Sequence, residues 1–361
     1  MIFMIPIAKP NIGEEEKKAV LDVLSSGMLA QGKKVAEFEE KFALYVGAKY
    51  AIATNNGTTA LHCMLLAHGI GPGDEVITSP FTFIASANAI LYCGGKPVFV
   101  DIDEESYNID PLLIEEKITD KTKAIMPVDL FGNPCDINKI LEIAKKNNLV
   151  VLQDAAQAHG ASVSGKKIGS FCTTSFSFYP TKNMTTGEGG IITTNDEQIN
   201  DKARLIRDHG SKVRYYHDVL GYNYRMTDIC AAIGIEQLKK IEGFNQKRIE
   251  NASYMAQKLS DITFITTPKV RENTRHVFHQ YTIRVPNRDK VISALLDNGI
   301  GHSVFYPVPV NEQKLYKEKG YISDTPVASK VAKEVLSIPI HPLVTNQDIN
   351  KIAEVLTLCL N

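Results

Sequence analysis

The stretch "SFSFYPTKNMTTGEGG", from Ser175 to Gly190, places a single lysine between a β-type run and a cluster of glycines. The alternating SFSF indicates a strand that ends at Tyr179–Pro180, because proline fixes φ and removes a backbone donor. The three glycines on the far side mark a turn before a second apolar run. A solvated lysine needs no such setting. We therefore interpret Lys182 as an amine placed at the end of a strand for covalent chemistry.

Further β-type runs lie along the first two-thirds of the chain, and helix-like stretches separate most of them. Two helical patterns closed by glycine, GEEEKKAVLDVLSSG and KKVAEFEEKFALYVGA, precede them. This alternation predicts an α/β fold with one large, mostly parallel seven-stranded sheet covered by helices on both faces. The seven expected strands are YAIAT (50–54), EVITS (75–79), PVFVDI (97–102), KAIMPV (123–128), LVVLQ (149–153), TSFSF (174–178) and GIITT (190–194).

The last third of the chain has a different pattern. A helical periodicity runs from Thr227 to about Leu259. Beyond it we expect β-structure at 279–286 and 302–307, and helices at RDKVISALLDNG, near 324–336 and near 346–359. This predicts a smaller α+β C-terminal domain. We place the large α/β domain, with its N-terminal helices, at 1–240 and the small domain at 241–361.

Composition argues against several classes of protein. Forty basic and 41 acidic residues give a net charge of −1, which does not favour nucleic acid or an anionic membrane as a partner. The amino-terminal MIFMIPIAKP is short and lacks a basic lead, so it is a poor signal peptide. No apolar run approaches the ~20 residues of a membrane helix. The six cysteines form no CxxC pair, which argues against a zinc site or a disulfide framework. We expect a cytoplasmic protein without a metal ion.

Two of the expected strands are followed by candidate binding residues, at the edge where parallel sheets place ligands. In NNGTTALH, Gly57 permits close backbone approach and Thr58 adds a hydroxyl at a helix start, which suits a phosphate group. The alternative is a plain turn with a threonine cap. In PFTFIASANA, Phe83 could lie flat over an aromatic ligand, and ordinary core packing is the alternative.

Two other strands end near ionisable residues. Asp154 closes the LVVLQ strand and could hold the protonated ring nitrogen of a pyridine cofactor, although Asp also serves as a helix cap at such positions. Lys182 could form a Schiff base with an aldehyde if desolvation lowers its pKa, although most lysines are surface residues. Phosphate seat, ring cover, carboxylate and amine thus occur in that order, each after a strand. These are the four attachments that pyridoxal phosphate requires.

Several stretches together resemble the DegT/StrS-type nucleotide-sugar aminotransferases, pyridoxal-phosphate enzymes with the aspartate aminotransferase fold (fold type I). The resemblance covers nearly the full length of the chain. It rests on NNGTTALH, TSPFTFIASANAI, QDAAQAHGA, SFSFYPTKNMTTGEGG, GYNYRMTDICAAIGIEQL and SIPIHP.

The resemblance implies a role for each matching residue. The catalytic residues would be Lys182, which binds the cofactor's aldehyde carbon, and Asp154, which pairs with its ring nitrogen. The other cofactor-binding residues would lie around the phosphate (Gly57, Thr58, Ser177), on the ring (Phe83) and at the ring oxygen (Gln157).

The GYNYRM segment of such enzymes usually reaches the neighbouring subunit's site. The resemblance therefore implies a homodimer with shared active sites, in which Asn223 contacts the cofactor phosphate of the other subunit. Arg225 is a further candidate for anion binding. One departure is Phe305, which stands where many relatives carry the histidine of a His–Tyr–Pro turn.

The implied reaction is pyridoxal-phosphate-dependent transfer of an amino group from L-glutamate to a keto group on a nucleotide-linked 4-keto-6-deoxyhexose, for polysaccharide or glycan biosynthesis. The forms TTGEGG and NYRMTD resemble the branch that aminates carbon four. The alternatives are amination at carbon three, a sugar dehydratase that carries histidine in place of the lysine, and a non-catalytic regulatory relative. An amino-acid aminotransferase would instead need a small-domain arginine for the α-carboxylate, with Arg271, Arg275, Arg284 and Arg288 as candidates.

Overall fold

The computed structural model describes residues 5–213 and 215–360, so the first four residues of the MIFMIPIAKP segment lie outside it. A seven-stranded sheet in the order β1-β9-β8-β5-β4-β2-β3 forms its centre. Only β9 runs antiparallel to its neighbours, which confirms the large, mostly parallel sheet. Each of the seven expected runs contributes one strand. The strands are β1 Tyr50–Thr54, β2 Glu75–Thr78, β3 Lys96–Phe99, β4 Thr122–Met126, β5 Val150–Asp154, β8 Thr173–Ser177 and β9 Gly190–Thr194.

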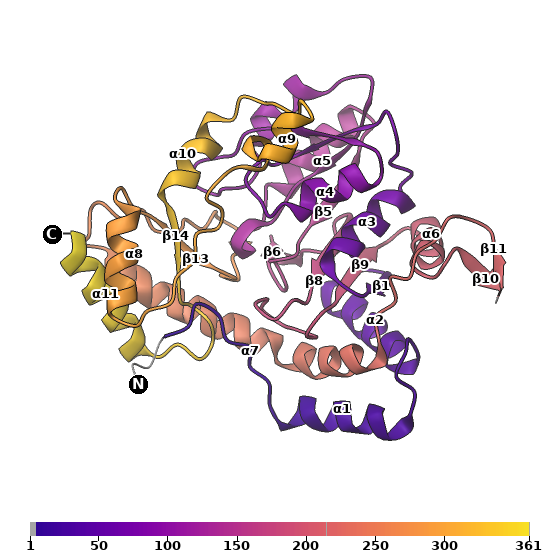
Figure 1. Ribbon diagram of the computed structural model, residues 1–361, viewed down its shortest axis with the longest axis horizontal. Helices are drawn as coiled ribbons and strands as arrows, with labels where there is room; N and C mark the ends of the chain where they lie inside the picture. The colour runs from indigo at the N-terminus through magenta and orange to yellow at the C-terminus, as the bar shows by residue number, and fades with distance from the viewer. Residues whose placement is uncertain (1–4, 214, 361) are drawn as a thin grey trace.

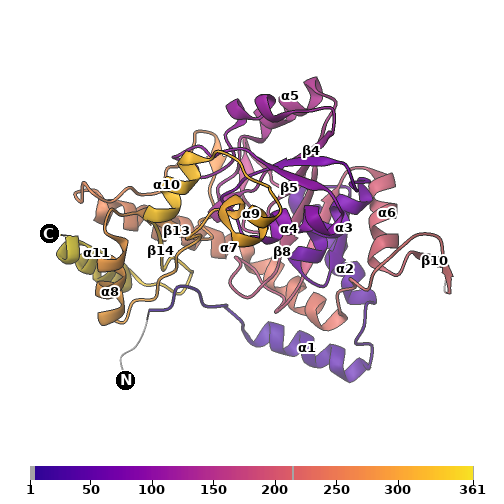
Figure 2. The same cartoon turned by 45° about the horizontal axis from the view of Figure 1, so that its top comes forward.

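Helices cover both faces of the sheet (Figure 2). Along several strands the side chains alternate between two cores, one on each face. In β1, Ala51 and Ala53 join one core while Ile52 joins the other. The first core is closed by α2 Lys33–Val46, α5 Ile137–Lys146 and the start of α7 Asp228–Leu259. The second core is closed by α3 Gly57–Ala67, α4 Ala85–Tyr92 and α6 Glu197–Arg207.

Glycines end the first two helices as expected. The helix α1 Glu14–Ser26 stops at Gly27 (φ 69°), and α2 stops at Gly47 (φ 81°). Both glycines adopt the left-handed conformation that side chains disfavour. The helix α1 then lies alongside α7 (Figure 1).

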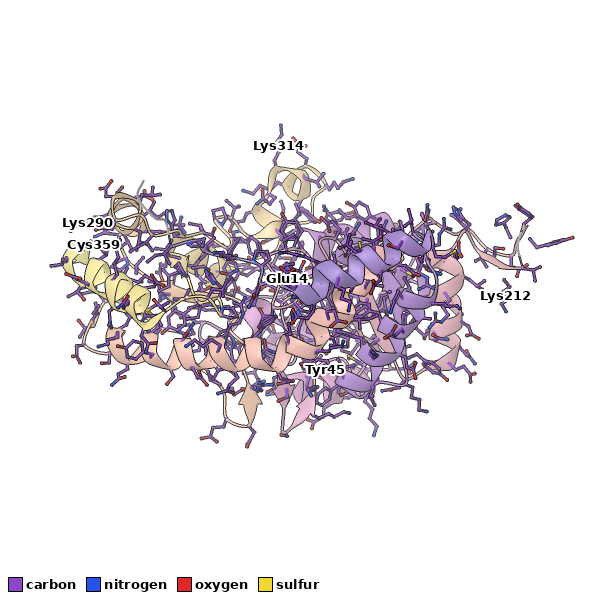
Figure 3. The ribbon with its side chains drawn as sticks, turned by 90° about the horizontal axis from the view of Figure 1, so that it is seen from below. Glu14, Tyr45, Lys212, Lys290, Lys314 and Cys359 are labelled. Carbon is purple, nitrogen blue, oxygen red and sulfur yellow. The ribbon has the colours of Figure 1, made fainter. Side chains whose placement is uncertain are left out.

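The helix α7 joins two hydrophobic cores along its 32 residues (Figures 1 and 3). Its first half contributes Ala231 and Ile235 to the sheet core, and its second half contributes Met255 and Leu259 to a separate core. Around that second core lie β13 Tyr281–Arg284, β14 Val335–Ile338, α8 Arg288–Asp297 and α11 Asn346–Leu360. Since α7 is continuous through residue 240, our boundary there stays a prediction.

Parts of the chain cross between these two regions. Near the amino terminus, Ile5 bridges to Ile300 and packs against the second core. In the sheet domain, the Asp101 carboxylate accepts hydrogen bonds from the first amides of α10 Pro326–Glu334, which belongs to the C-terminal third. The hydroxyl of Tyr316, on α9 Lys314–Glu318, donates to Asn88 at 2.7 Å. The C-terminal third is therefore fastened onto the sheet domain.

The expectation of a strand at 302–307 was wrong. Only Ser303 pairs there, in an isolated bridge to Ser337. The antiparallel partner of β13 is β14, whose first residues, Val335 and Leu336, we had placed at the end of a helix near 324–336. Other short elements were also not anticipated: β6 Ser162–Val163, β7 Lys166–Lys167, β12 Thr274–Arg275, and the 3-10 turns η1 Pro111–Leu113, η2 Glu115–Lys117, η3 Leu130–Gly132 and η4 Val310–Glu312.

A two-stranded hairpin projects from the sheet domain. It consists of β10 Ser211–Val213 and β11 Tyr216–His217, and it carries Lys212 at one extreme of the molecule (Figures 1 and 3). Within the described ranges, no helix combines the length and the apolar character that crossing a bilayer requires.

Candidate active site

The carboxyl ends of β1, β2, β5 and β8 meet at one edge of the sheet, and a cavity of about 670 Å³ opens there. Seven of the eight predicted site residues line this cavity, although they come from four separate segments of the chain. The structure therefore brings them together, while their individual roles stay predictions. The seven are Gly57, Thr58, Phe83, Asp154, Gln157, Ser177 and Lys182.

Lys182 lies in the loop between β8 and β9. Its backbone N–H donates to the Tyr179 carbonyl at 2.9 Å, which closes the turn that presents the side chain to the cavity. The apolar surroundings penalise the ammonium form and lower the pKa of Lys182 to about 8, and the nearby Asp154 carboxylate opposes this shift. An amine with such a pKa is a much better nucleophile near neutral pH than an ordinary lysine.

Asp154 ends β5 and is only 3% exposed. Its backbone N–H donates to the Pro127 carbonyl, which fixes the peptide between β4 and β8. The carboxylate accepts a hydrogen bond from Ser86 Oγ to Oδ2 at 2.7 Å and one from the Ala156 amide to Oδ1 at 3.1 Å. Burial raises the pKa of Asp154, while these donors and Lys182 lower it. The sequence had not led us to Ser86.

The start of α3 forms a narrow backbone cradle. Asn56 caps the helix by accepting a hydrogen bond from the Thr59 amide at 2.9 Å. The first amides of a helix have no acceptor within it, so those of Gly57 and Thr58 can serve an anion. A Cβ at Gly57 would lie 2.6 Å from the Cβ of Ser177, so only glycine lets this turn approach the end of β8.

Gln157 is held in one orientation. Its Oε1 accepts a hydrogen bond from the Phe131 amide at 2.6 Å, so its Nε2 is the atom that donates to Tyr306 Oη at 3.3 Å. Tyr306 follows β13 by about two dozen residues and still lines the same cavity. We had not identified Tyr306 as a site residue, although it follows Phe305 in the turn whose departure from the His–Tyr–Pro form we had noted.

The two phenylalanines beside Thr82 have different environments. Phe83 is 56% exposed and lines the cavity, with its ring centroid 6.1 Å from that of Tyr306. Phe81 is fully buried and packs against Tyr107 and Phe131. Phe81 is therefore a residue of the hydrophobic core, whereas the exposed ring of Phe83 can cover a planar ligand in the cavity.

Asn223 does not line the cavity of its own chain. It is exposed and pairs through its backbone with Asp208. The guanidinium of Arg225 forms an ion pair with the Asp208 carboxylate, so this side chain already has an anionic partner. The expected role of Asn223 concerns a second subunit and stays a prediction.

Each of the four candidate arginines named above forms its hydrogen bonds or ion pairs away from the cavity. They bind backbone carbonyls or carboxylates, and none lines the cavity within the described part of the chain. Their acceptors are the carbonyls of Pro134 and Cys135 for Arg271, Glu242 for Arg275, Glu104 and Glu334 for Arg284, and the Ala332 carbonyl for Arg288.

Comparison with protein families matches residues 10–357 to the DegT/DnrJ/EryC1/StrS aminotransferase family. The chain belongs to this family. The aminotransferase is 44% identical, over 93% of both chains, to a protein of Geobacillus stearothermophilus named pleiotropic regulatory protein. It is 43% identical, over 96% of both chains, to GDP-perosamine synthase of Caulobacter vibrioides. Among solved structures, DesV of S. venezuelae, in complex with a ketimine intermediate, matches with a TM-score of 0.94 and 35% identity, covering 96% of this chain and 95% of that one.

The aminotransferase is thus a pyridoxal-phosphate-dependent nucleotide-sugar aminotransferase with fold type I. The residues present fit this cofactor. The first amides of α3, at Gly57 and Thr58, lie at the cavity together with Ser177, which suits a phosphate group. The cavity also offers a carboxylate for a protonated ring nitrogen and an amine of lowered pKa for an aldehyde.

Proposed function

We propose that the aminotransferase transfers the amino group of L-glutamate to the keto group at carbon four of a nucleotide-linked 4-keto-6-deoxyhexose, for polysaccharide biosynthesis in the cytoplasm. The observation that carries the proposal is the convergence of Lys182 and Asp154, from separate strands, in one cavity beside the α3 cradle. The resemblance of TTGEGG and NYRMTD to the carbon-four branch supports the choice of carbon. The similarity to GDP-perosamine synthase supports a nucleotide sugar as the acceptor.

The predicted site residues of the cavity have distinct proposed roles toward the cofactor or the substrate. Pyridoxal phosphate, when bound, supplies an electron sink that stabilises negative charge on the substrate carbon. Lys182 would bind it covalently, Asp154 would pair with its ring nitrogen, and Gly57, Thr58 and Ser177 would hold its phosphate. Once free, Lys182 Nζ can accept a proton from the substrate carbon and return it, because its pKa of about 8 lets both forms exist near neutral pH.

The occupied arginines support a sugar acceptor over an amino-acid acceptor. An amino-acid aminotransferase of this fold needs a guanidinium to clamp the α-carboxylate. In the described chain, Lys182 is the only lysine or arginine that lines the cavity. A keto sugar carries no carboxylate at its reacting end and needs no such clamp, whereas the α-carboxylate of the donor L-glutamate would need a cation from outside this cavity, such as one on a second subunit.

A homodimer with shared sites is part of the proposal. Asn223 is exposed at the base of a projecting hairpin, and its neighbour Leu220 is 81% exposed, which suits burial against a second copy. Mixing Lys182→Ala with Asn223→Ala protein tests this. Hybrid dimers regain one intact site if Asn223 acts on the partner, so activity should rise above that of either parent. No gain on mixing would contradict the shared site.

The reaction itself is tested by supplying keto sugars linked to GDP, dTDP or UDP together with L-glutamate. We expect stoichiometric 2-oxoglutarate and an amino sugar whose new C–N bond NMR places at carbon four. A C–N bond at carbon three would overturn the assignment of the carbon. A deoxygenated sugar without nitrogen would indicate dehydration, and transfer only to 2-oxo acids would indicate an amino-acid aminotransferase.

A further inference from the structure

Two buried hydroxyl groups, of Thr82 and Ser86, form a hydrogen-bonded series that ends at the Asp154 carboxylate. Ser86 Oγ lies 2.7 Å from Asp154 Oδ2, and Thr82 Oγ1 lies 2.9 Å from Ser86 Oγ. All three residues are at most 4% exposed. Thr82 lies in the bend before α4 and Ser86 lies in the first turn of that helix, and the bend brings the two hydroxyl groups together.

The direction of these hydrogen bonds follows from the acceptors. A hydroxyl has one hydrogen to donate. Ser86 has the Asp154 carboxylate at 2.7 Å and the Phe83 carbonyl at 3.2 Å, and the shorter contact to a charged acceptor takes that hydrogen. Thr82 then donates to Ser86. A chain in which each hydroxyl both accepts and donates strengthens the last bond, the one that reaches the carboxylate.

We propose that Ser86, reinforced by Thr82, is a positioning residue that keeps Asp154 ionised and oriented toward the ring nitrogen of the cofactor. The proposal rests on the cofactor assignment of the proposed function. A buried carboxylate without donors would take up a proton, and a neutral Asp154 could not pair with a protonated ring nitrogen. Ser86 and the Ala156 amide each hold one carboxylate oxygen, which leaves a lone pair on each oxygen for the ligand.

Other ionisable groups also face Asp154. Lys182 comes from the β8–β9 loop and stabilises the carboxylate. Burial raises the pKa values of Asp129, after β4, and of Tyr306, from the small domain, and the Asp154 charge adds to both shifts. Asp129 binds the Cys135 amide and Gln153, and Tyr306 binds Gln157. Unlike these groups, Ser86 donates a hydrogen bond from its hydroxyl directly to the Asp154 carboxylate.

The test compares three variants of the holoenzyme. Ser86→Ala removes the direct donor, Thr82→Val removes only the reinforcement, and Ser175→Ala is the matched control. Ser175 is as buried as Ser86 and lies beside Asp154 in the sheet, but its hydroxyl has only a 3.5 Å contact with the Gln153 carbonyl. The readouts are the dissociation constant of pyridoxal phosphate and the pH dependence of its visible absorption, neither of which needs a substrate.

We expect Ser86→Ala to weaken cofactor binding about tenfold or more near neutral pH, on the scale of one lost charged hydrogen bond. The loss should grow as the pH falls, because the pKa of Asp154 rises without its donor. Thr82→Val should lose less, and the double variant no more than Ser86→Ala alone. Ser86→Thr should restore binding, and Ser175→Ala should match the wild type.

Three results would overturn the proposal: wild-type binding in Ser86→Ala, a loss that is the same at every pH, or an equal loss in Ser175→Ala. A loss independent of pH would mean that Ser86 contacts the ligand rather than acting through Asp154. If the wild-type protein binds no pyridoxal phosphate, the proposed function fails instead. The two failures are therefore distinguishable.

Discussion

Gly57 and Ser177 approach each other so closely that a Cβ on Gly57 would lie 2.6 Å from the Ser177 Cβ. This contact joins the start of α3 to the end of β8, and so it joins the proposed phosphate seat to the strand that leads to Lys182. Neither residue can be recognised as part of a pair from its own neighbours in the sequence. Their proximity follows from the strand order, in which only β9 separates β1 from β8.

The first prediction concerns this contact. Gly57→Ala should weaken pyridoxal phosphate binding about 10- to 100-fold, because overpacking of about 1–3 kcal/mol must displace Ser177 or the helix start. Equilibrium dialysis measures the effect. Gly71→Ala is the control, since a Cβ there meets nothing within 4 Å. Equal affinity of the two variants for pyridoxal phosphate would contradict a phosphate site at the start of α3.

A second prediction concerns the covalent bond. Lys182→Ala should keep its fold and lose all borohydride-dependent attachment of the cofactor, because no other amine of the described chain lines the cavity. Peptide mapping after reduction measures the attachment, and circular dichroism checks the fold. Lys290→Ala, on the exposed face of α8, should label like the wild type. Labelling of the Lys182→Ala cavity at another residue would contradict the assignment.

The pH dependence of cofactor attachment gives a third prediction. Lys182 reacts as the free amine, so the attachment rate to cofactor-free protein should rise with pH around a midpoint of about 8 rather than 10.5. The sign follows from burial, which disfavours the ammonium form. In Asp154→Asn the midpoint should fall further, because the carboxylate that stabilises the ammonium is gone. A midpoint near 10.5, or an upward shift in Asp154→Asn, would show that Lys182 is solvated.

The fourth prediction addresses how the two regions are joined. Arg284, on β13, pairs with Glu104 of the sheet domain at 2.7 Å and with Glu334 of α10, and its side chain is only 11% exposed. Arg284→Met should cost about 1–3 kcal/mol of unfolding free energy, because it leaves the Glu334 carboxylate without its partner, whereas Glu104 keeps its ion pair with Lys330. Denaturant unfolding measures this. Lys314→Met, from an exposed pair with Glu318, should cost less than about 0.5 kcal/mol. Similar costs in both variants would mean that the Arg284 pair is as weak as a surface pair.

Much of the sheet could be predicted because its strands are apolar runs that stop at turn residues. The prediction failed where local pattern and long-range pairing disagree. The stretch 302–307 is rich in β-formers, yet only Ser303 finds a partner. The helix α10 ends at Glu334 and the strand β14 begins at the next residue, Val335. Because no glycine or proline marks this boundary, the sequence pattern extended the helix into the strand.

Part of the site could also be predicted, because its residues follow apolar strands. Gly57, Asp154 and Lys182 follow strands, and the edge of a parallel sheet gathers such residues. Tyr306 reaches the cavity through the packing of the small domain, which no local spacing encodes. Ser86 reaches Asp154 through the bend that precedes α4, a geometry that the spacing of residues in the sequence does not predict.

The most direct test of the account is the visible absorption spectrum of the purified protein with pyridoxal phosphate, before and after L-glutamate and then with a nucleotide-linked keto sugar. The account predicts a yellow band that glutamate bleaches as 2-oxoglutarate appears, and that returns when the keto sugar takes the nitrogen. A yellow band that glutamate leaves unchanged would contradict the proposed donor. The absence of any yellow band would contradict the central claim, that the Lys182 cavity binds this cofactor covalently.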